Sequence, residues 1–459
     1  MATTTHEQPA RERTVGNAPM YVVLAGTLVT FLDFFIVNVA LPSIERDLGA
    51  TSSMLSLVVA GYALTFAVGM IPGGRLGDLY GRRRMFAVGI ALFTVTSAAC
   101  GLAPTAELLV VARFLQGAAG AIMTPQVLAI LGTVYTGSRR AKAFAAYGFA
   151  MGIAGVLGQL LGGALIQADI GGLGWRTIFL INVPVGLVTL AAVGRVPESH
   201  GTRARLDLTG VALVTATVSA VVLPLVEGPE HDWPLWTWLC LATSPILAGL
   251  LVRHLRTRAA RDASPLVDPG LFANRTFTLG LVVTLGFTLV PPAFFFALAL
   301  YLQQGRGLTA LESGTVFVAV GAGYFGALLL ANAVAARIGS QVLALGAGAV
   351  AVGCVLLVDT AHSPVLATLP GLALVGLGIG FVLVPLASTV LADTAAEHAG
   401  AASGVLSTVQ QVGGALGIAV VSITMFGEGA VVDGFTLSLW VLAGIAALTV
   451  ASSQVLARR

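Results

Sequence analysis

The sequence predicts an all-α polytopic membrane protein with 14 transmembrane helices. Three observations lead to this fold class. The 459 residues are 57% hydrophobic and only 10% charged, which leaves too little polar surface for a water-soluble fold. Apolar segments of about 20 residues or more, enough to cross a hydrocarbon core of ~30 Å, recur through the chain. Positive charge alternates from loop to loop, as it does between the two sides of a membrane.

The apolar segments define the expected helices. The first follows a polar stretch and lacks a good cleavage site, so we expect it to be a retained helix and not a signal peptide. The predicted spans are 20–42, 54–75, 84–104, 107–134, 141–165, 176–196, 207–226, 235–255, 276–302, 311–335, 340–359, 363–392, 400–424 and 435–455.

The loops share the positive charge unequally. The chain has 24 Lys and Arg residues, and 20 of them fall in the termini and in alternate loops. The opposite loops hold Arg46, Arg176 and Arg306, while Arg113 lies inside a span. Because Lys and Arg are retained on the cytoplasmic side, we expect both termini to be cytoplasmic. The excess of Arg over Lys suggests a GC-rich bacterial genome, and hence a bacterial cell membrane.

A short repeat indicates how the helices are grouped. QLLGGAL at 159–165 matches QQVGGAL at 410–416, and both lie in the fifth helix of a half if two central helices are set aside. Parallel repeats of this kind build many transporters. The predicted division is a cytoplasmic tail (1–19), an N-terminal six-helix half (20–200), two inserted helices (201–262), a C-terminal six-helix half (263–455) and a cytoplasmic tail (456–459).

Composition argues against several kinds of chemistry. Cys100, Cys240 and Cys354 are isolated within spans, and the six histidines fall in loops, in tails or at the end of a span, so we expect no metal site. The chain has no GxxxxGK[ST] segment for ATP hydrolysis. We therefore expect no cofactor, no enzymatic activity and no nucleic-acid partner. The expected partners of a monomer are the lipid bilayer, protons and a small hydrophobic substrate.

Asp33 is the exception within the apolar run TFLDFFIVNVALP, residues 30–42. It is the only one of the 21 acidic residues that we place deep in a span. A carboxylate inside a membrane is costly and is usually kept for function, as in a proton relay. The alternative is a structural carboxylate that a neighbour satisfies.

Arg113, in the segment RFLQGAAGA, is the expected partner of Asp33. Asp33 lies ~20 Å above the cytoplasmic end of its helix, and Arg113 lies ~9 Å below the outer end of its own, so the two share a level in a ~30 Å core. Gln116 lies on the same helix face as Arg113 and can hydrogen-bond either partner. Alternatively, the Arg113 side chain extends to the outer membrane surface.

Small and polar side chains suggest where the halves meet. Glycines in span 141–165 let another helix approach closely, either for tight packing alone or as a sliding seam between the halves. The stripe consists of Gly148, Gly152, Gly155, Gly158 and Gly162, with Gly163 beside it.

Five further residues are candidates for lining a substrate cavity, with core packing as the alternative for each. They are Asn38, Gln126, Phe295, Gln410 and Gln411.

The charged loop GRLGDLYGRRRMF, residues 74–86, predicts a conformational clasp. Asp78 at the end of one helix is within reach of Arg82 and Arg83, and such an ion-pair cluster can hold one conformation and release in another. Gly74 and Gly77 let the two flanking helices approach closely, and Gly81 belongs to the same conformational segment. The simpler alternative is a topology signal alone.

These segments together resemble the major facilitator superfamily. Gly74-x-Leu76-x-Asp78-x-x-Gly81-Arg82-Arg83 is similar to its cytoplasmic loop motif, and Arg113-x-x-Gln116-Gly117 to its fourth-helix motif. LDFFIVNVALP, WRTIFLINVPVG (175–186) and PLVDPGLFANRTF (265–277) resemble segments of the 14-helix drug:proton antiporters of the EmrB/QacA type. The resemblance implies export of hydrophobic compounds driven by protons, with Asp33 as proton carrier and Arg113 as its regulator.

One position departs from the antiporter pattern. The fifth-helix motif of antiporters usually has proline after the glycine at 158, and this chain has Gln159. Without that proline we expect a straighter helix in which Gln159 can hydrogen-bond. The departure leaves a proton-coupled symporter or a uniporter for uptake open as an alternative. A membrane-embedded enzyme fits less well, because it would need a cluster of reactive side chains and only one deep acid is present. A receptor also fits less well, because it would not explain a buried ion pair.

Overall fold

The computed structural model describes residues 16–201, 207–228, 231–261, 265–266, 269–339, 341–390, 399–426 and 430–457. The predicted N-terminal tail therefore lies almost wholly outside the described residues. Fourteen helical segments among the described residues are long and apolar enough to cross a membrane, which confirms the predicted fold class. Every one of them overlaps a predicted span.

The first seven α-helices cover residues 18–192, and we call them the N-terminal group. They are α1 (Ala18–Leu48), α2 (Ser52–Tyr80), α3 (Arg82–Gly101), α4 (Ala106–Val134), α5 (Gly137–Ala168), α6 (Thr177–Leu180) and α7 (Asn182–Ala192). Short 3-10 turns flank α6 and α7 (Ile170–Gly172, Gly174–Arg176 and Val193–Arg195). Within the group α2 packs on α4, α1 on α5 and α3 on α4.

The remaining helices comprise the inserted pair and the C-terminal group. The inserted pair is α8 (Leu208–Glu227) and α9 (Leu235–Ala260). The C-terminal group is α10 (Arg275–Thr288), α11 (Val290–Leu300), α12 (Ala310–Ile338), α13 (Gln341–Thr360), α14 (Leu369–Val390), α15 (Ala399–Met425) and α16 (Val431–Ala457). Three short helical turns complete it (Pro269–Ala273, Tyr301–Gly305 and Val365–Thr368).

Local sequence explains where several helices begin and break. Thr309 and Glu312 form a capping box at the start of α12. The ninth span is divided at Leu289, directly before Pro291 and Pro292, because prolines cannot donate the backbone hydrogen bonds that would continue it. The sixth span is divided at Ile181, so that Asn182 begins α7.

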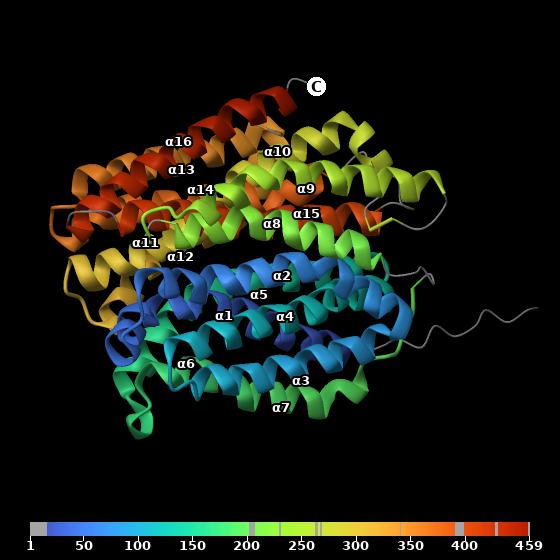
Figure 1. The fold of residues 1–459 in the computed structure, drawn as a ribbon, viewed down its shortest axis with the longest axis horizontal. Coiled ribbons are helices and arrows are strands. Elements are labelled where there is room, and N and C mark those ends of the chain that lie inside the picture. The colour runs from blue at the N-terminus through green and yellow to red at the C-terminus, as the bar shows by residue number, and fades with distance from the viewer. Residues whose placement is uncertain are drawn as a thin grey trace, which may run out of the picture.

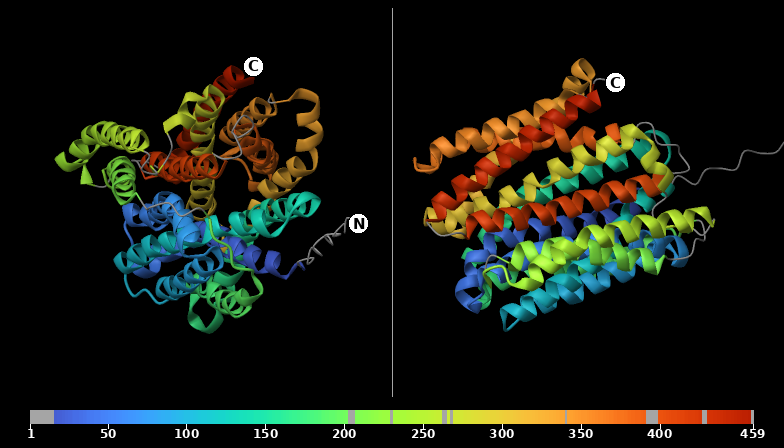
Figure 2. Two further views of the ribbon diagram at one scale, coloured as in Figure 1. Left: turned by 90° about the vertical axis from the view of Figure 1, so that its right-hand side faces the viewer. Right: turned by 45° about the horizontal axis from the view of Figure 1, so that its top comes forward.

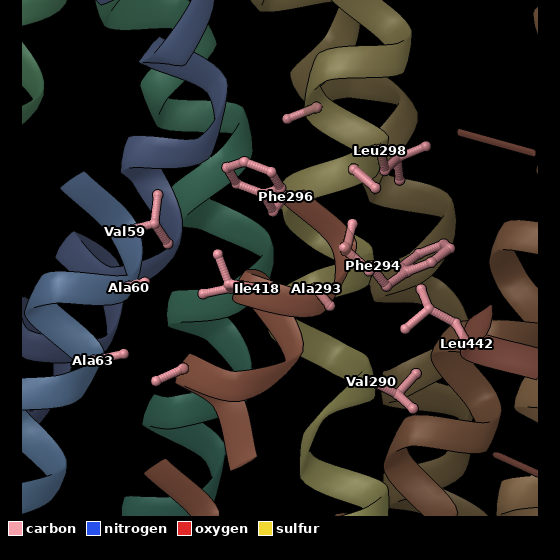
Figure 3. Close-up of a cluster of buried hydrophobic side chains, with 14 of the residues drawn as sticks. Val59, Ala60, Ala63, Val290, Ala293, Phe294, Phe296, Leu298, Ile418 and Leu442 are labelled. Atoms are coloured by element: carbon pink, nitrogen blue, oxygen red, sulfur yellow. The ribbon is translucent and has the colours of Figure 1, made fainter. Parts of the chain in front are cut away.

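The two groups lie side by side, and their helices run in roughly the same direction (Figure 1). The largest contacts between them are made by α5 with α12 and by α2 with α15, and α1 also touches α11. Figure 3 shows the second contact, where the small side chains of Ala60 and Ala63 on α2 lie beside Ile418 of α15. We call the end of the bundle near residues 81, 201 and 339 the terminal end, and the opposite end the far end.

The inserted helices lie at the edge of the seam between the groups (Figure 2). Of the pair, α8 touches both α2 and α15, whereas α9 packs mainly on α8. Asp207 joins them, because its carboxylate accepts hydrogen bonds from Gly210 N (2.9 Å), Leu266 N (3.1 Å) and His254 Nε2 (2.8 Å). Burial opposes ionisation of Asp207, but these bonds outweigh it and hold the pKa of the carboxyl below its usual value.

Candidate functional site

Asp33, Arg113 and Gln116 lie in contact in the middle of the N-terminal group. All three side chains are fully buried. Arg113 Nη1 donates to Asp33 Oδ2 at 2.5 Å, and Gln116 Nε2 donates to Asp33 Oδ1 at 2.9 Å. Because residues three apart on a helix share a face, α4 presents Arg113 and Gln116 to α1 together. The structure thus brings together the three residues that the sequence singled out, and Arg113 does not extend to the membrane surface.

Two further residues, which sequence reasoning missed, complete the network. Asn182 Nδ2 donates to Asp33 Oδ1 at 2.7 Å, and Gln116 Nε2 also donates to Ser97 Oγ at 2.7 Å. Asn182 is positioned by the break that starts α7, and it lies inside the segment WRTIFLINVPVG. That motif was the available signal, since an asparagine in an apolar segment needs a partner. Side chains from α1, α3, α4 and α7 therefore form one hydrogen-bonded network that includes the Asp33 carboxylate.

Arg113 is held from three sides. Its Nε donates to Val58 O of α2 at 2.8 Å, and its Nη1 donates to Gln116 Oε1 at 2.7 Å. The guanidinium carbon lies 4.4 Å from the centre of the Tyr62 ring, a cation–π contact. Its Nη2 has no hydrogen-bond partner among the described residues. A buried ion pair seldom adds net stability over apolar packing, so its presence here points to a role beyond folding.

A cavity of about 180 Å³ lies between the two groups of helices, next to this network. Tyr62 belongs to both, because its ring lines the cavity and also covers the Arg113 guanidinium. Asp33 does not line the cavity, although its neighbours on α1 do. The lining comprises Thr30, Phe31, Phe34, Phe35, Tyr62, Phe66, Met151, Gly152, Gly155, Thr288, Pro291, Pro292, Phe295, Phe317, Val320, Gly321, Tyr324, Gly376, Ile379, Leu383, Gln410, Gln411 and Gly414.

Three of the five candidate cavity residues line this cavity, and two do not. Phe295, Gln410 and Gln411 face it. Asn38 is buried, with its Nδ2 donating to Phe35 O of the same helix at 3.0 Å, and its Oδ1 has no hydrogen-bond partner among the described residues. Gln126 is packed between α2 and α4, with its Nε2 donating to Gly73 O at 2.7 Å. The structure therefore does not place Asn38 or Gln126 at this cavity, since the amide nitrogen of each donates to a nearby backbone carbonyl.

The charged loop forms a cluster at the terminal end. Arg82 Nη2 donates to Asp78 Oδ1 at 3.0 Å. Arg83 does not contact Asp78; its Nε lies 3.6 Å from Glu198, a residue that sequence reasoning did not connect to this loop. Gly81 has a φ of +99°, a conformation that side chains disfavour, and a Cβ there would lie 2.8 Å from the Glu198 carboxylate. By contrast, Gly74 has only an ordinary contact with Pro125, so packing does not require glycine there.

Comparison with known proteins identifies the family of this chain. The profile described as Major Facilitator Superfamily matches residues 23–418. The chain belongs to the major facilitator superfamily. A Streptomyces coelicolor protein described as a probable actinorhodin transporter is 37% identical over 441 residues, which cover 91% of this chain and 75% of that relative. The puromycin resistance protein Pur8 of Streptomyces alboniger is 34% identical and covers 95% of this chain and 90% of the relative.

Solved structures show the same fold. The crystal structure of a D-xylose–proton symporter superposes on this transporter with a TM-score of 0.68 at 15% identity, covering 95% of this chain and 96% of that one. A bacterial homologue of the lysosomal transporter Spinster, solved in an inward-facing and unoccupied conformation, also gives 0.68, at 16% identity, covering 96% of this chain and 97% of that one. This chain is accordingly a membrane transporter and not an enzyme.

The glycine stripe of the transporter faces two different neighbours. Gly158 and Gly162 pack against α1 within the same group, where added Cβ atoms would lie 3.2 Å from Ile36 N and 2.8 Å from Ile36 Cγ1. Gly152 and Gly163 instead face α12 of the other group. The hypothesis of a seam between the halves therefore does not hold for Gly158 and Gly162, because these positions of α5 point back into their own group.

Gln159 forms a bond between two helices of the N-terminal group. Its Nε2 donates to Phe35 O at 2.8 Å, and its Oε1 is buried without a hydrogen-bond partner among the described residues. Helix α5 continues without a break from Gly137 to Ala168, as expected when the antiporter proline is absent. Gln159 thus links α5 to the α1 segment that lines the cavity.

Proposed function

We propose that this transporter exports a small hydrophobic compound from the bacterial cell in exchange for protons, by alternating access. The observation that carries the proposal is the fully buried Asp33 carboxylate, paired with Arg113 beside an apolar cavity between the two groups. An ionisable pair inside a membrane is usually kept for proton or substrate movement. Relatives described as a puromycin resistance protein and a cephamycin export protein support export of antibiotic-like compounds.

The geometry supports a simple coupling scheme. Protonation of Asp33 removes its charge and so weakens its attraction to Arg113. Because the Tyr62 ring lies against the Arg113 guanidinium and also lines the cavity, a shift of Arg113 changes the cavity wall, and a substrate against Tyr62 disturbs the pair. A proton that moves through 100 mV supplies ~2.3 kcal/mol, which can concentrate a neutral substrate roughly fiftyfold.

Contacts between the groups favour a conformation that is closed at the far end. Ser56 Oγ and Ser422 Oγ lie 2.8 Å apart, and Gln303 Nε2 donates to Val39 O at 2.9 Å. Both bonds lie on the far side of the cavity. If the terminal end is cytoplasmic, as the charge distribution favours, this conformation faces inward. We also propose that the transporter acts as a monomer, because the two groups of helices in a single chain form the walls of the cavity.

The decisive experiment measures proton movement driven by substrate. The purified transporter in proteoliposomes that contain a pH-sensitive dye would be given compounds from a panel that includes puromycin. Exchange predicts that inward movement of the compound drives protons out of the vesicle and raises the internal pH. Internal acidification would show symport instead, and compound movement with no pH change would show uniport.

The orientation prediction rests on the unequal distribution of Lys and Arg. Cysteine in place of His200 should be protected from an impermeant thiol reagent in intact cells, whereas cysteine in place of His231 should be labelled. Both positions are exposed in the structure, so accessibility of the side chain is matched. A background without the three native cysteines is needed. Labelling only at position 200 would place the termini outside.

The proposed clasp at Asp78 makes a kinetic prediction. Asp78→Asn removes the charge that holds Arg82 and should slow turnover by shifting the balance between inward-facing and outward-facing states, with substrate affinity changed only a few-fold. Transport rate and equilibrium binding would be measured on the same preparation. Because Asp78 lies outside the cavity lining, a large and selective loss of affinity would contradict the clasp and indicate direct binding.

A further inference from the structure

We infer that the cavity selects neutral, flat aromatic compounds that carry a hydrogen-bonding oxygen or nitrogen at one edge. The inference rests on the proposed function, since it treats the cavity between the groups as the substrate site. Three properties of the described lining support it: the arrangement of the aromatic rings, the absence of charged side chains among these residues, and amide groups that have no hydrogen bond within the described part of the chain.

Aromatic rings from both groups of helices form the walls. Phe295 of α11 and Phe317 of α12 are stacked, with centroids 5.5 Å apart and planes 11° apart. Phe35 of α1 meets Phe295 at 5.3 Å, across the boundary between the groups. On α2, Tyr62 and Phe66 are also stacked, at 5.8 Å and 12°. Parallel rings present flat faces and edges, which pack best against another planar ring system.

The described lining contains no Asp, Glu, Lys, Arg or His. The two charged residues of the neighbouring network, Asp33 and Arg113, are fully buried. They neutralise each other behind Tyr62. A cationic ligand would lose its hydration without gaining a counter-ion. Cation–π attraction from the rings offsets only part of that cost. A neutral ligand has no such cost.

Gln410 and Gln411 provide the polar contacts. Both line the cavity from α15, both are half-buried, and neither side chain has a hydrogen bond among the described residues. An amide can donate and accept, so the pair can bind a carbonyl, a hydroxyl or a ring nitrogen. A site with unsatisfied amides disfavours a ligand that leaves them unpaired. The ~180 Å³ volume suits a molecule of a few fused rings.

Four ligands that share a three-ring skeleton test the polar edge and the absence of charge independently. Equilibrium binding to the intact transporter in lipid nanodiscs would be measured for anthraquinone, acridine, anthracene and N-methylacridinium. Anthraquinone and acridine are neutral with a polar edge, anthracene lacks polar atoms, and N-methylacridinium carries a permanent charge. We expect anthracene to bind about three- to tenfold more weakly than anthraquinone, and N-methylacridinium at least about tenfold more weakly than acridine.

Variants of the lining residues test which side chains produce the preference for neutral ligands with a polar edge. Gln410→Leu combined with Gln411→Leu should reduce the affinity for anthraquinone to that for anthracene, while anthracene binding stays the same or improves. Phe295→Leu should weaken all neutral ligands together. Gln454→Leu is the matched control, because Gln454 bonds Gln341 outside the cavity, and it should change no ligand's affinity.

Several results would overturn the inference. N-methylacridinium binding as tightly as acridine would show that the rings act as a cation site. An unchanged preference for anthraquinone in the double variant would exclude the glutamines, and a failure of all four wild-type ligands to bind would exclude this ligand class. No proton gradient is used, so a transporter that couples protons but prefers cations would retain the proposed function and lose only this inference.

Discussion

Asp33→Asn should abolish proton-driven efflux while leaving substrate binding within a few-fold of wild type. Asparagine has nearly the same shape as aspartate, and its carbonyl can still accept from Gln116 and Asn182. It cannot take up and release a proton, so the step that would couple the gradient to transport is lost. Because Asp33 does not line the cavity, substrate contacts should remain. Counterflow, which needs no gradient, should therefore persist.

The measurement compares accumulation against a gradient, across a range of pH, with counterflow in the same vesicles. Asp47→Asn is a matched control, because it makes the same substitution on the same helix at a carboxylate that is 47% exposed and paired with Arg176. That variant should pump normally, since exposed ion pairs contribute little. Accumulation by Asp33→Asn with undiminished proton flux would show that Asp33 is a structural residue.

Arg113→Met should cause the largest loss of stability among substitutions in the network. It keeps the side-chain volume similar but leaves the Asp33 carboxylate buried without its cation. Removing one partner of a buried pair costs about 3–5 kcal/mol. The double variant Asp33→Asn with Arg113→Met contains no uncompensated charge and should recover much of that stability. Unfolding in detergent, followed for the wild type, both single variants and the double variant, gives the coupling energy directly.

The corresponding control is Arg176→Met at the exposed pair with Asp47. Its arginine side chain is 25% exposed and its partner 47% exposed, so the expected loss is at most about 1 kcal/mol. If the effects of Asp33→Asn and Arg113→Met were simply additive, the two residues would not act as a pair, and the coupling scheme would lose its physical basis.

Much of the fold could be predicted because membrane helices leave a strong one-dimensional signal. Length and hydropathy located the 14 spans that the described residues contain. The pairing of Asp33 with Arg113 could also be predicted, because a buried charge needs a partner and depth along each helix restricts the choice. These arguments require only distances along a helix axis.

The contacts that could not be predicted depend on how helices are rotated and placed beside one another. Ser97 and Asn182 reach the network only because α3 and α7 lie against α4 and α1. For the same reason the sequence did not show that Asn38 and Gln126 lie away from the cavity. A wheel projection shows which residues share a face, but not which neighbour that face meets. Tyr62 was missed because an aromatic residue within a span is ordinary.

The seal at the far end has an energetic consequence. Besides the bonds at Ser56 and Gln303, Gln304 Nε2 donates to the Glu45 carboxylate at 2.5 Å. A neutral bond contributes about 0.5–1.5 kcal/mol net, and a bond to a charged group about 1.5–3 kcal/mol. Part of the remaining contact is between small residues, as where a Cβ at Gly314 would lie 2.6 Å from Gln159 O. Helix surfaces made of small residues can separate without unpacking interdigitated side chains. Under the proposed proton exchange, the ~2.3 kcal/mol that one proton supplies at 100 mV is comparable to the free energy of a few such bonds. We therefore expect one protonation event to shift the balance between the inward-facing and outward-facing arrangements.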